Sequence, residues 1–301
     1  MKKDREKLSG TLTILATYIM WGLLPAFWNL LTEVNSVFIL SQRIVWSLVF
    51  MGLILLLMRR FGEIRQVLHD RKMLTTCFIS GILITINWGL YIWAVNSGHV
   101  LDASMGYFIQ PVVVALVGVL AFKERPRALE WVTFGFATAG ILFLVLRNGT
   151  VPVIALALGV TFAVYGAVKK NLPLGGEVSL FTETLLMTPF ALAFTVYAAA
   201  SGMEGCTGVL SGWSWLLLPA CGVVTSVPLL CYNLGVKKIP FYLSGILMYI
   251  NPTLQFLMGL LYFREPLDHN RLYAFIFIWI GVLFTFADKL LLMRKNRKTA
   301  A

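Results

Sequence analysis

The sequence contains few of the residues on which most enzyme chemistry depends. Of its 301 residues only three are histidine and four are cysteine. The histidines, His69, His99 and His269, all fall between apolar runs, so a serine within such a run has no histidine partner there. The sequence has no HExxH pattern, no CxxC pair and no GxxxxGK[ST] loop. We therefore predict no catalytic site, no metal and no cofactor.

Charged residues are also scarce. They make up 13% of the chain against 58% hydrophobic residues, with a mean hydropathy of +0.80. Soluble domains have about 25% charged residues, so this composition predicts a polytopic membrane protein. The net charge of +11 does not indicate nucleic-acid binding, because no basic segment outside the apolar runs is long enough to form such a domain.

Ten apolar runs are long enough to cross a bilayer core, which takes roughly 20 residues. We expect spans at residues 10–31, 37–58, 73–95, 102–122, 128–146, 151–168, 179–200, 213–235, 241–263 and 272–292. The first run is too long for a signal-peptide core and no small-residue cleavage site closes it, so we expect it to remain as the first span.

The basic residues predict the orientation of the spans. With ten spans, 21 of the 25 Lys and Arg residues fall on the side of the two termini, three fall on the other side, and Arg43 lies inside a span. Positive charge is enriched in cytoplasmic loops. We therefore expect a multi-pass membrane protein with both termini in the cytoplasm.

One stretch of sequence occurs twice. Residues 107–126 read YFIQPVVVALVGVLAFKERP, and residues 249–266 read YINPTLQFLMGLLYFREP, with their shared residues 141 positions apart. At the offset of 141, Pro111 matches Pro252 without a gap, and farther along Gly140 matches Gly281. Internal repeats of this kind are typical of transporters.

The repeat and the span count together predict the architecture. Residues 1–147 and 148–301 would each hold five spans, and an odd number of spans places the second unit upside down relative to the first. We expect an all-α integral membrane protein of ten transmembrane helices in two inverted five-helix repeats. The alternative is a duplicated bundle with no role in transport.

Short runs along the whole chain are similar to those of a known transporter family. They are Trp21-Gly22, Pro25, Arg43, Asn87-Trp88, IWAVN at residues 92–96, ASMGYFIQP at 103–111, Tyr165-Gly166, Glu183-Thr184 and VPLLC at 227–231. With the duplicated plan, they resemble the drug/metabolite transporter superfamily, its EamA-type members and, among these, the RarD group of bacterial permeases. Gln110, where the group more often has Asn, and the segment 263–266 depart from the pattern. The resemblance implies a secondary transporter of small metabolites or drugs in the bacterial inner membrane, in a group whose name is linked to chloramphenicol sensitivity.

Two charged residues lie within predicted spans, where each costs several kcal/mol unless it faces protein or water. The offset of 141 places Gln42-Arg43 and Glu183-Thr184 at equivalent positions of the two repeats. We hypothesise that Arg43 anchors an anionic group of a solute and that Glu183 accepts a proton or contacts a cation. The alternative is that each only joins neighbouring helices.

Amides and aromatic rings that interrupt apolar spans are the candidate walls of a solute cavity, since they bind neutral, zwitterionic or apolar groups. Asn87, Trp88 and Tyr91 share one helix face in mid-span. The other candidates are Tyr107, Gln110, Tyr232, Asn233 and Asn251. For any one aromatic residue, packing or a place in the membrane-interface belt is the alternative.

Three prolines within spans are candidate hinges. Pro111, Pro228 and Pro252 each remove a backbone hydrogen bond and bend a helix. Pro111 and Pro252 lie at equivalent positions of the repeats, each next to an amide. We expect them to bend as one repeat rocks against the other.

We expect a secondary active permease that moves a small organic solute by alternating access, with the family resemblance favouring export. A lipid flippase or a passive channel is the alternative, and an intramembrane enzyme is not favoured. The expected partners are a small-molecule substrate and membrane lipid but no nucleic acid, and the protein would be a monomer or a homodimer.

Overall fold

The computed structural model describes residues 2–96, 100–149, 153–206, 208–264, 269–270, 272–274 and 276–284, and every regular element among them is helical. The α-helices are α1 (Lys2–Trp28), α2 (Ser36–Leu57), α3 (Phe61–His69), α4 (Arg71–Asn96), α5 (Val100–Phe122), α6 (Ala128–Asn148), α7 (Val153–Asn171), α8 (Gly176–Ala200), α9 (Leu217–Gly235), α10 (Phe241–Met248) and α11 (Ile250–Leu257). A π-helical turn, Met258–Tyr262, follows α11.

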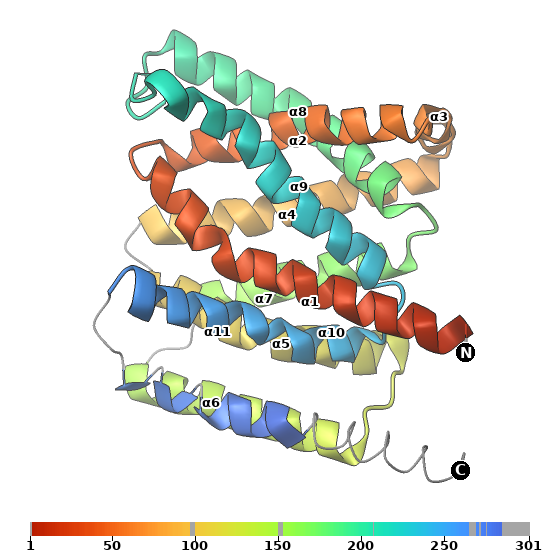
Figure 1. The fold of residues 1–301 in the computed structure, drawn as a ribbon, viewed down its shortest axis with the longest axis vertical. Coiled ribbons are helices and arrows are strands. Elements are labelled where there is room, and N and C mark those ends of the chain that lie inside the picture. Colours follow the sequence, from red (N-terminus) through yellow and green to blue (C-terminus); the bar gives the residue numbers. More distant parts are fainter. Residues whose placement is uncertain are drawn as a thin grey trace.

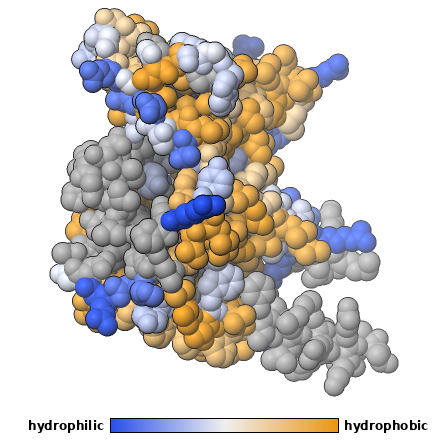
Figure 2. All heavy atoms as spheres, turned by 60° about the vertical axis from the view of Figure 1, so that its left-hand side comes forward, coloured by the Kyte–Doolittle hydropathy of each residue, from blue (hydrophilic) through white to orange (hydrophobic). Residues whose placement is uncertain are grey.

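Eight helices in the described part of the chain are long and apolar enough to cross a membrane, and two shorter apolar helices are Ile109–Phe122 and Leu272–Phe284. The side chains that face outward are largely apolar, with Leu57 83% and Leu146 80% exposed. Figure 2 shows hydrophobic residues over much of the visible surface, with hydrophilic residues at its edges and a few across its middle. These features confirm a multi-pass membrane protein, while the number of ten spans stays a prediction.

The helices stack along the long axis of the molecule (Figure 1). Helices α2 and α8 lie at one end of this axis, α6 lies at the other, and α1, α4, α7 and α9 lie between them. The start of α1 and the short helix α3 lie on the same side of the bundle, at the right of Figure 1. We call this side the N-terminal end of the bundle.

Helix α6 packs against Leu272–Phe284 through contacts that the offset of 141 interchanges. A Cβ atom added at Gly140 would lie 3.0 Å from the carbonyl oxygen of Ala274, and one added at Gly281 would lie 3.0 Å from that of Thr133. Gly281 and Thr133 are the offset equivalents of Gly140 and Ala274. The residue numbers run in opposite senses along the two helices, so the helices are antiparallel. A two-fold relation between the two halves of the chain produces this kind of reciprocity.

Helices α2 and α8, which are also equivalent under the offset, run antiparallel as well. Gln42 donates a hydrogen bond to the hydroxyl of Thr195 at 3.2 Å, near one end of the pair. At the other end Arg60 forms an ion pair with Glu177. Two equivalent helices that point in opposite directions are what an axis within the membrane plane would give.

The loop after α5 fastens the start of α10. The carboxylate of Glu124 accepts the backbone N–H groups of Phe241 and Tyr242 at 2.7 and 2.9 Å, and its Oε1 lies 3.5 Å from Nζ of Lys170. A carboxylate at a helix N-terminus is favoured because the first N–H groups of a helix have no partner within it. The preceding residue, Lys123, has φ +52°, and its repeat equivalent Arg264 has φ +54°.

The predicted span 241–263 contains a break. Helix α10 ends at Met248 and α11 begins at Ile250, so that Tyr249 lies between them. Pro252 has no N–H to donate to the carbonyl of Met248, which explains why the regular helical hydrogen bonds are interrupted one turn before it, although Tyr249 keeps helical backbone angles of φ −60° and ψ −16°. Pro111 and Pro228 instead lie inside α5 and α9, which remain continuous. Whether the three prolines act as hinges stays a prediction.

Candidate functional site

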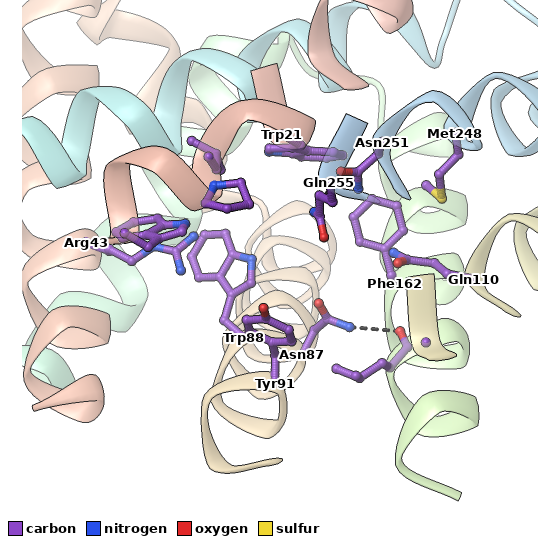
Figure 3. A pocket seen from close by; sticks show the side chains of 15 residues that line it. Trp21, Arg43, Asn87, Trp88, Tyr91, Gln110, Phe162, Met248, Asn251 and Gln255 are labelled. Carbon is purple, nitrogen blue, oxygen red and sulfur yellow. Dashed lines mark hydrogen bonds between the residues drawn. The ribbon is translucent and has the colours of Figure 1, made fainter. Parts of the chain in front are cut away.

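A cavity of about 120 Å³ lies within the bundle, between α1, α2, α4, α5, α7, α10 and α11 (Figure 3). The predicted residues that line it are Arg43, Asn87, Trp88, Tyr91, Gln110 and Asn251. Aromatic and apolar side chains from α1, α7 and α10 complete the wall. They include Trp21, Trp28, Phe162 and Met248. The amides and aromatic rings interrupting these spans thus come together at one place.

Arg43 brings a positive charge to the cavity wall between two indole rings. The guanidinium carbon lies 4.7 Å from the ring centroid of Trp28 and 4.2 Å from that of Trp88. Its Nε donates a hydrogen bond to the hydroxyl of Thr225 at 3.0 Å. Such stacking on aromatic faces stabilises a guanidinium away from bulk water. The group is thereby held in a fixed orientation beside the cavity.

Four amide side chains supply the polar part of the wall. Nδ2 of Asn87 donates to the carbonyl of Leu158 and to the hydroxyl of Thr161, both at 2.8 Å. These bonds tie α4 to α7 beside the cavity and use both donors of the amide. Across the cavity, Nε2 of Gln255 donates to Oδ1 of Asn251 at 2.9 Å. Figure 3 shows these two amides and Gln110 on the side opposite Arg43.

Three predicted residues do not line this cavity in the described structure. Tyr232 is fully buried, and its ring lies behind the wall, with centroids 5.8 Å from Trp21 and 5.4 Å from Phe162. Asn233, also buried, accepts a hydrogen bond from the hydroxyl of Tyr165 at 3.4 Å. The third is Glu183, and the side chain of Tyr107 lies outside the described residues. A binding role for any of the ten stays a prediction.

Glu183 belongs to a separate polar group, which we call the Lys169 cluster: Lys169, Glu183, Ser179 and Ser80. Nζ of Lys169 lies 2.5 Å from both Oε1 of Glu183 and Oγ of Ser179. Ser80 and Ser179 donate to the same Oε1 at 2.7 and 3.0 Å. Lys169 is 0% and Glu183 2% exposed. The cluster joins α4, α7 and α8 toward the N-terminal end of the bundle, where Glu177 of α8 meets Arg60.

A second lysine lies near this cluster, in the turn after α9. Lys237 donates hydrogen bonds to the carbonyls of Leu172 and Leu174 at 2.6 and 2.5 Å. Burial, together with the positive charge of Lys169, lowers the pKa of Lys237 to about 8. Two lysines and one glutamate therefore share a poorly solvated region.

Sequence reasoning missed the place of Lys169 and several residues of the cavity wall. Lys169 stands beside Lys170 just after the predicted span 151–168, and such a pair is typical of a loop. Helix α7 extends to Asn171 and takes Lys169 inside. The offset of 141, which pairs Trp28 with Lys169 and Gln42 with Glu183, is the signal that could have linked them. Phe162 and Met248 lie in apolar runs that nothing distinguishes.

Comparison with known proteins agrees with the resemblance in the sequence. Residues 8–146 match the model of the EamA-like transporter family. Protein RarD of Streptomyces exfoliatus is 39% identical over 297 residues, which cover 99% of this chain and 94% of that protein. The uncharacterized transporter YojE of Bacillus subtilis is 39% identical over 94% of this chain and 95% of its own length. A protein solved by crystallography, 19% identical over 94% of this chain and 98% of its own, has the same fold with a TM-score of 0.70. The chain thus belongs to the EamA-like transporter family of the drug/metabolite transporter superfamily, with RarD proteins among its relatives.

Proposed function

We propose that this protein is a secondary active permease that moves a small organic solute across the bacterial inner membrane by alternating access. The observation that supports this most is the cavity, which combines a guanidinium, four amides and several aromatic faces inside a membrane-embedded bundle. Helices from both 1–147 and 148–301 line it. A site at the interface of two repeats is where transporters of this architecture bind their solutes.

The contacts between equivalent helices support two inverted units. The Gly140 and Gly281 contacts interchange under the offset of 141, and α2 is antiparallel to α8. In the proposed mechanism one unit rocks against the other, with Pro111, Pro228 and Pro252 as the points of bending. The N-terminal end of the bundle would face the cytoplasm, and transport would run outward.

The proposed roles of the site residues follow from their chemistry. Arg43 would anchor an anionic group, while Asn87, Gln110 and Asn251 would hydrogen bond to polar groups of the solute. Trp88 and Tyr91 would cover its apolar part. Tyr107, Tyr232 and Asn233 would complete or support the wall, and Glu183 would accept the proton that drives exchange.

A thermal-shift screen of the purified protein would test this proposal. The panel contains amino acids, nucleosides, vitamins and amphenicol antibiotics, since a ligand of the folded state raises its apparent stability by mass action. We expect a saturable rise in Tm that Arg43→Gln and Asn87→Ala abolish. The matched control is Arg147→Gln, because Arg147 also faces an aromatic ring, Phe143, at 5.7 Å but lies away from the cavity. A hit that survives Arg43→Gln and Asn87→Ala would contradict a site in this cavity.

Flux of the hit in proteoliposomes separates a permease from its alternatives. A permease gives saturable uptake that unlabelled solute on the opposite side accelerates by exchange. A passive channel gives flux without saturation and without exchange. A flippase moves labelled lipid across the bilayer whether or not the solute is present. Either of the last two results would replace the permease proposal.

A further inference from the structure

Two polar clusters occupy equivalent positions in the two halves of the chain. Around Arg43, residues of α1 and α2 meet α9 through Trp28 and Thr225. Around Glu183, residues of α7 and α8 meet α4 through Lys169 and Ser80. The offset of 141 carries α1, α2 and α4 onto α7, α8 and α9. Each cluster therefore fastens the first two spans of one unit to the third span of the other.

The two clusters lie toward opposite ends of the bundle. Arg43 follows the first turns of α2, at the end away from Arg60, whereas Glu183 follows the first turns of α8, which starts beside Arg60. Helices α4 and α7, which the Lys169 cluster joins, are also the helices that Asn87 ties together at the cavity. A separation of α4 and α7 at the Lys169 cluster would open a path from the N-terminal end of the bundle toward the cavity.

The Lys169 cluster is compact but incompletely satisfied. Oε1 of Glu183 receives three donors, while Oε2 is buried and has no hydrogen-bond partner in the described structure. Breaking a buried ion pair by removing one charge is costly, because the other charge stays buried and uncompensated. The other titratable groups facing the pair are Cys77 on α4, Tyr165 on α7 and Lys237 after α9. A change in the charge of either Lys169 or Glu183 would therefore destabilise the contact between their helices.

We propose that the Lys169 cluster is the gate of the cavity at the N-terminal end of the bundle. In this proposal a proton takes the place of the Lys169 ammonium as the partner of the Glu183 carboxylate. The proton comes from the solution at the opposite end, through the cavity when it is open there, and forms an O–H bond on the Glu183 carboxylate. The neutral carboxyl no longer holds the ammonium of Lys169, and α7 parts from α4 and α8. The gate rests on the proposed function, because it assumes that the cavity opens to each side in turn.

Two native cysteines can report on the two clusters without any ligand. Cys77 is buried on α4, and its carbonyl oxygen accepts a hydrogen bond from Ser80 at 3.1 Å. Cys221 is buried on α9, at the position equivalent to Ser80 and within electrostatic reach of Arg43. Full-length variants that retain only Cys77 or only Cys221, the other three cysteines being replaced by alanine, would be labelled with N-ethylmaleimide.

We expect Glu183→Gln, which mimics the protonated carboxyl, and Lys169→Met each to accelerate labelling of Cys77 by about tenfold or more, as removal of a buried ion pair would allow. Labelling of Cys221 should not accelerate in either variant. Lys170→Met is the matched control, because Lys170 is adjacent but pairs with Glu124 instead. In Lys170→Met, labelling of Cys77 should stay as slow as in the wild-type background.

The pair of variants separates opening from a simple change in thiol reactivity. A thiol ionises less readily beside a carboxylate and more readily beside an ammonium, so electrostatics alone would accelerate labelling in Glu183→Gln and slow it in Lys169→Met. Opening of the gate accelerates both. The charge-swapped variant Lys169→Glu with Glu183→Lys should restore slow labelling.

Opposite changes in the two variants, or no change in either, would overturn the gate. If Lys169→Met fails to fold, the uncharged change Ser80→Ala with Ser179→Ala carries the test, and it must accelerate labelling of Cys77. The labelling of Cys77 needs no solute. If the ligand screen gives no hit but Cys77 labelling accelerates as expected, the result counts against the cavity proposal alone. A bound solute with an unresponsive Cys77 would count against the gate alone.

Discussion

The Arg43 and Lys169 clusters occupy equivalent positions but use opposite means to hold a charge. The guanidinium of Arg43 is spread over two indole rings and borders a cavity. The ammonium of Lys169 is a compact charge, fully buried and bonded to a carboxylate. Stacking leaves a charge available to a ligand, whereas an ion pair neutralises it. Helices that are equivalent under the offset of 141 thus hold their charges by different chemistry.

The largest expected effect comes from removing one member of the Lys169 pair. Lys169→Met leaves the Glu183 carboxylate buried without its counter-charge, which costs roughly 3–5 kcal/mol of stability. Adding Glu183→Leu removes the orphaned charge and should restore most of the loss. Thermal unfolding of the two single variants and the double variant measures the coupling. Additive losses would mean that the two charges do not stabilise each other.

The next largest effect is expected at Gly222, whereas its repeat equivalent, Gly81, should tolerate an added Cβ atom. A Cβ atom added at Gly222 would lie 2.5 Å from the carbonyl oxygen of Trp46 and 2.7 Å from its Cβ, with the carbonyl carbon closer still. One added at Gly81, the repeat equivalent, would lie 3.3 Å from the flexible Cγ of Met187 and 3.4 Å from the carbonyl oxygen of Glu183, which are longer distances. We expect Gly222→Ala to cost about 1–3 kcal/mol through overpacking and Gly81→Ala less than about 1 kcal/mol. Unfolding of the two variants in parallel measures both, and equal losses would contradict this difference.

Arg43 should show a smaller effect on stability. Arg43→Lys keeps the charge but loses the flat group between Trp28 and Trp88, at a cost of about 1–2 kcal/mol. Arg147→Lys is the control, because Arg147 lies near a single ring, Phe143, at the surface, and it should change stability by less than about 0.5 kcal/mol. Melting temperatures measure both. A loss at Arg147 as large as that at Arg43 would argue against the stacking.

The smallest expected effect is a pH dependence at Lys237. Because burial and Lys169 lower its pKa from 10.5 to about 8, the folded protein loses this proton more readily than the unfolded chain. The cost of burying the charge is therefore fully present below pH 8 and disappears as the pH rises toward 10.5. The melting temperature of the wild type relative to Lys237→Met should rise across that window. A constant difference would place the Lys237 pKa at its ordinary value.

Much of the fold was predictable because apolar run length and basic loops are direct signals of membrane topology. The predicted span 179–200 corresponds to α8, and 217–235 within the predicted span 213–235 is α9. The register of the repeat pairs Gly140 with Gly281, and these two residues lie on helices that pack against each other. The irregular turn at Tyr249 was not predicted, because the sequence places Pro252 and Pro111 in equivalent contexts. In the structure α5 is continuous through Pro111, whereas the helix that contains Pro252 is interrupted at Tyr249.

The candidate site was predictable where polar residues interrupt apolar spans. Asn87, Gln110 and Asn251 stand out for that reason and line one cavity. Phe162 does not stand out, since an aromatic residue in an apolar run carries no sign of which way it faces. The ion pair of Glu183 with Lys169 was not predicted, because Lys169 resembled a loop residue. Which charge pairs with which depends on how α7 and α8 cross, and one sequence does not contain that information.

The irregular turn at Tyr249 adjoins the far wall of the cavity. Asn251 and Gln255 lie one turn apart on α11, just after the break, and a hydrogen bond joins them. Any pivot at Tyr249 would carry both amides together as one rigid lever arm. The far wall would then change its distance from Arg43 without changing the pattern of donors and acceptors that it presents.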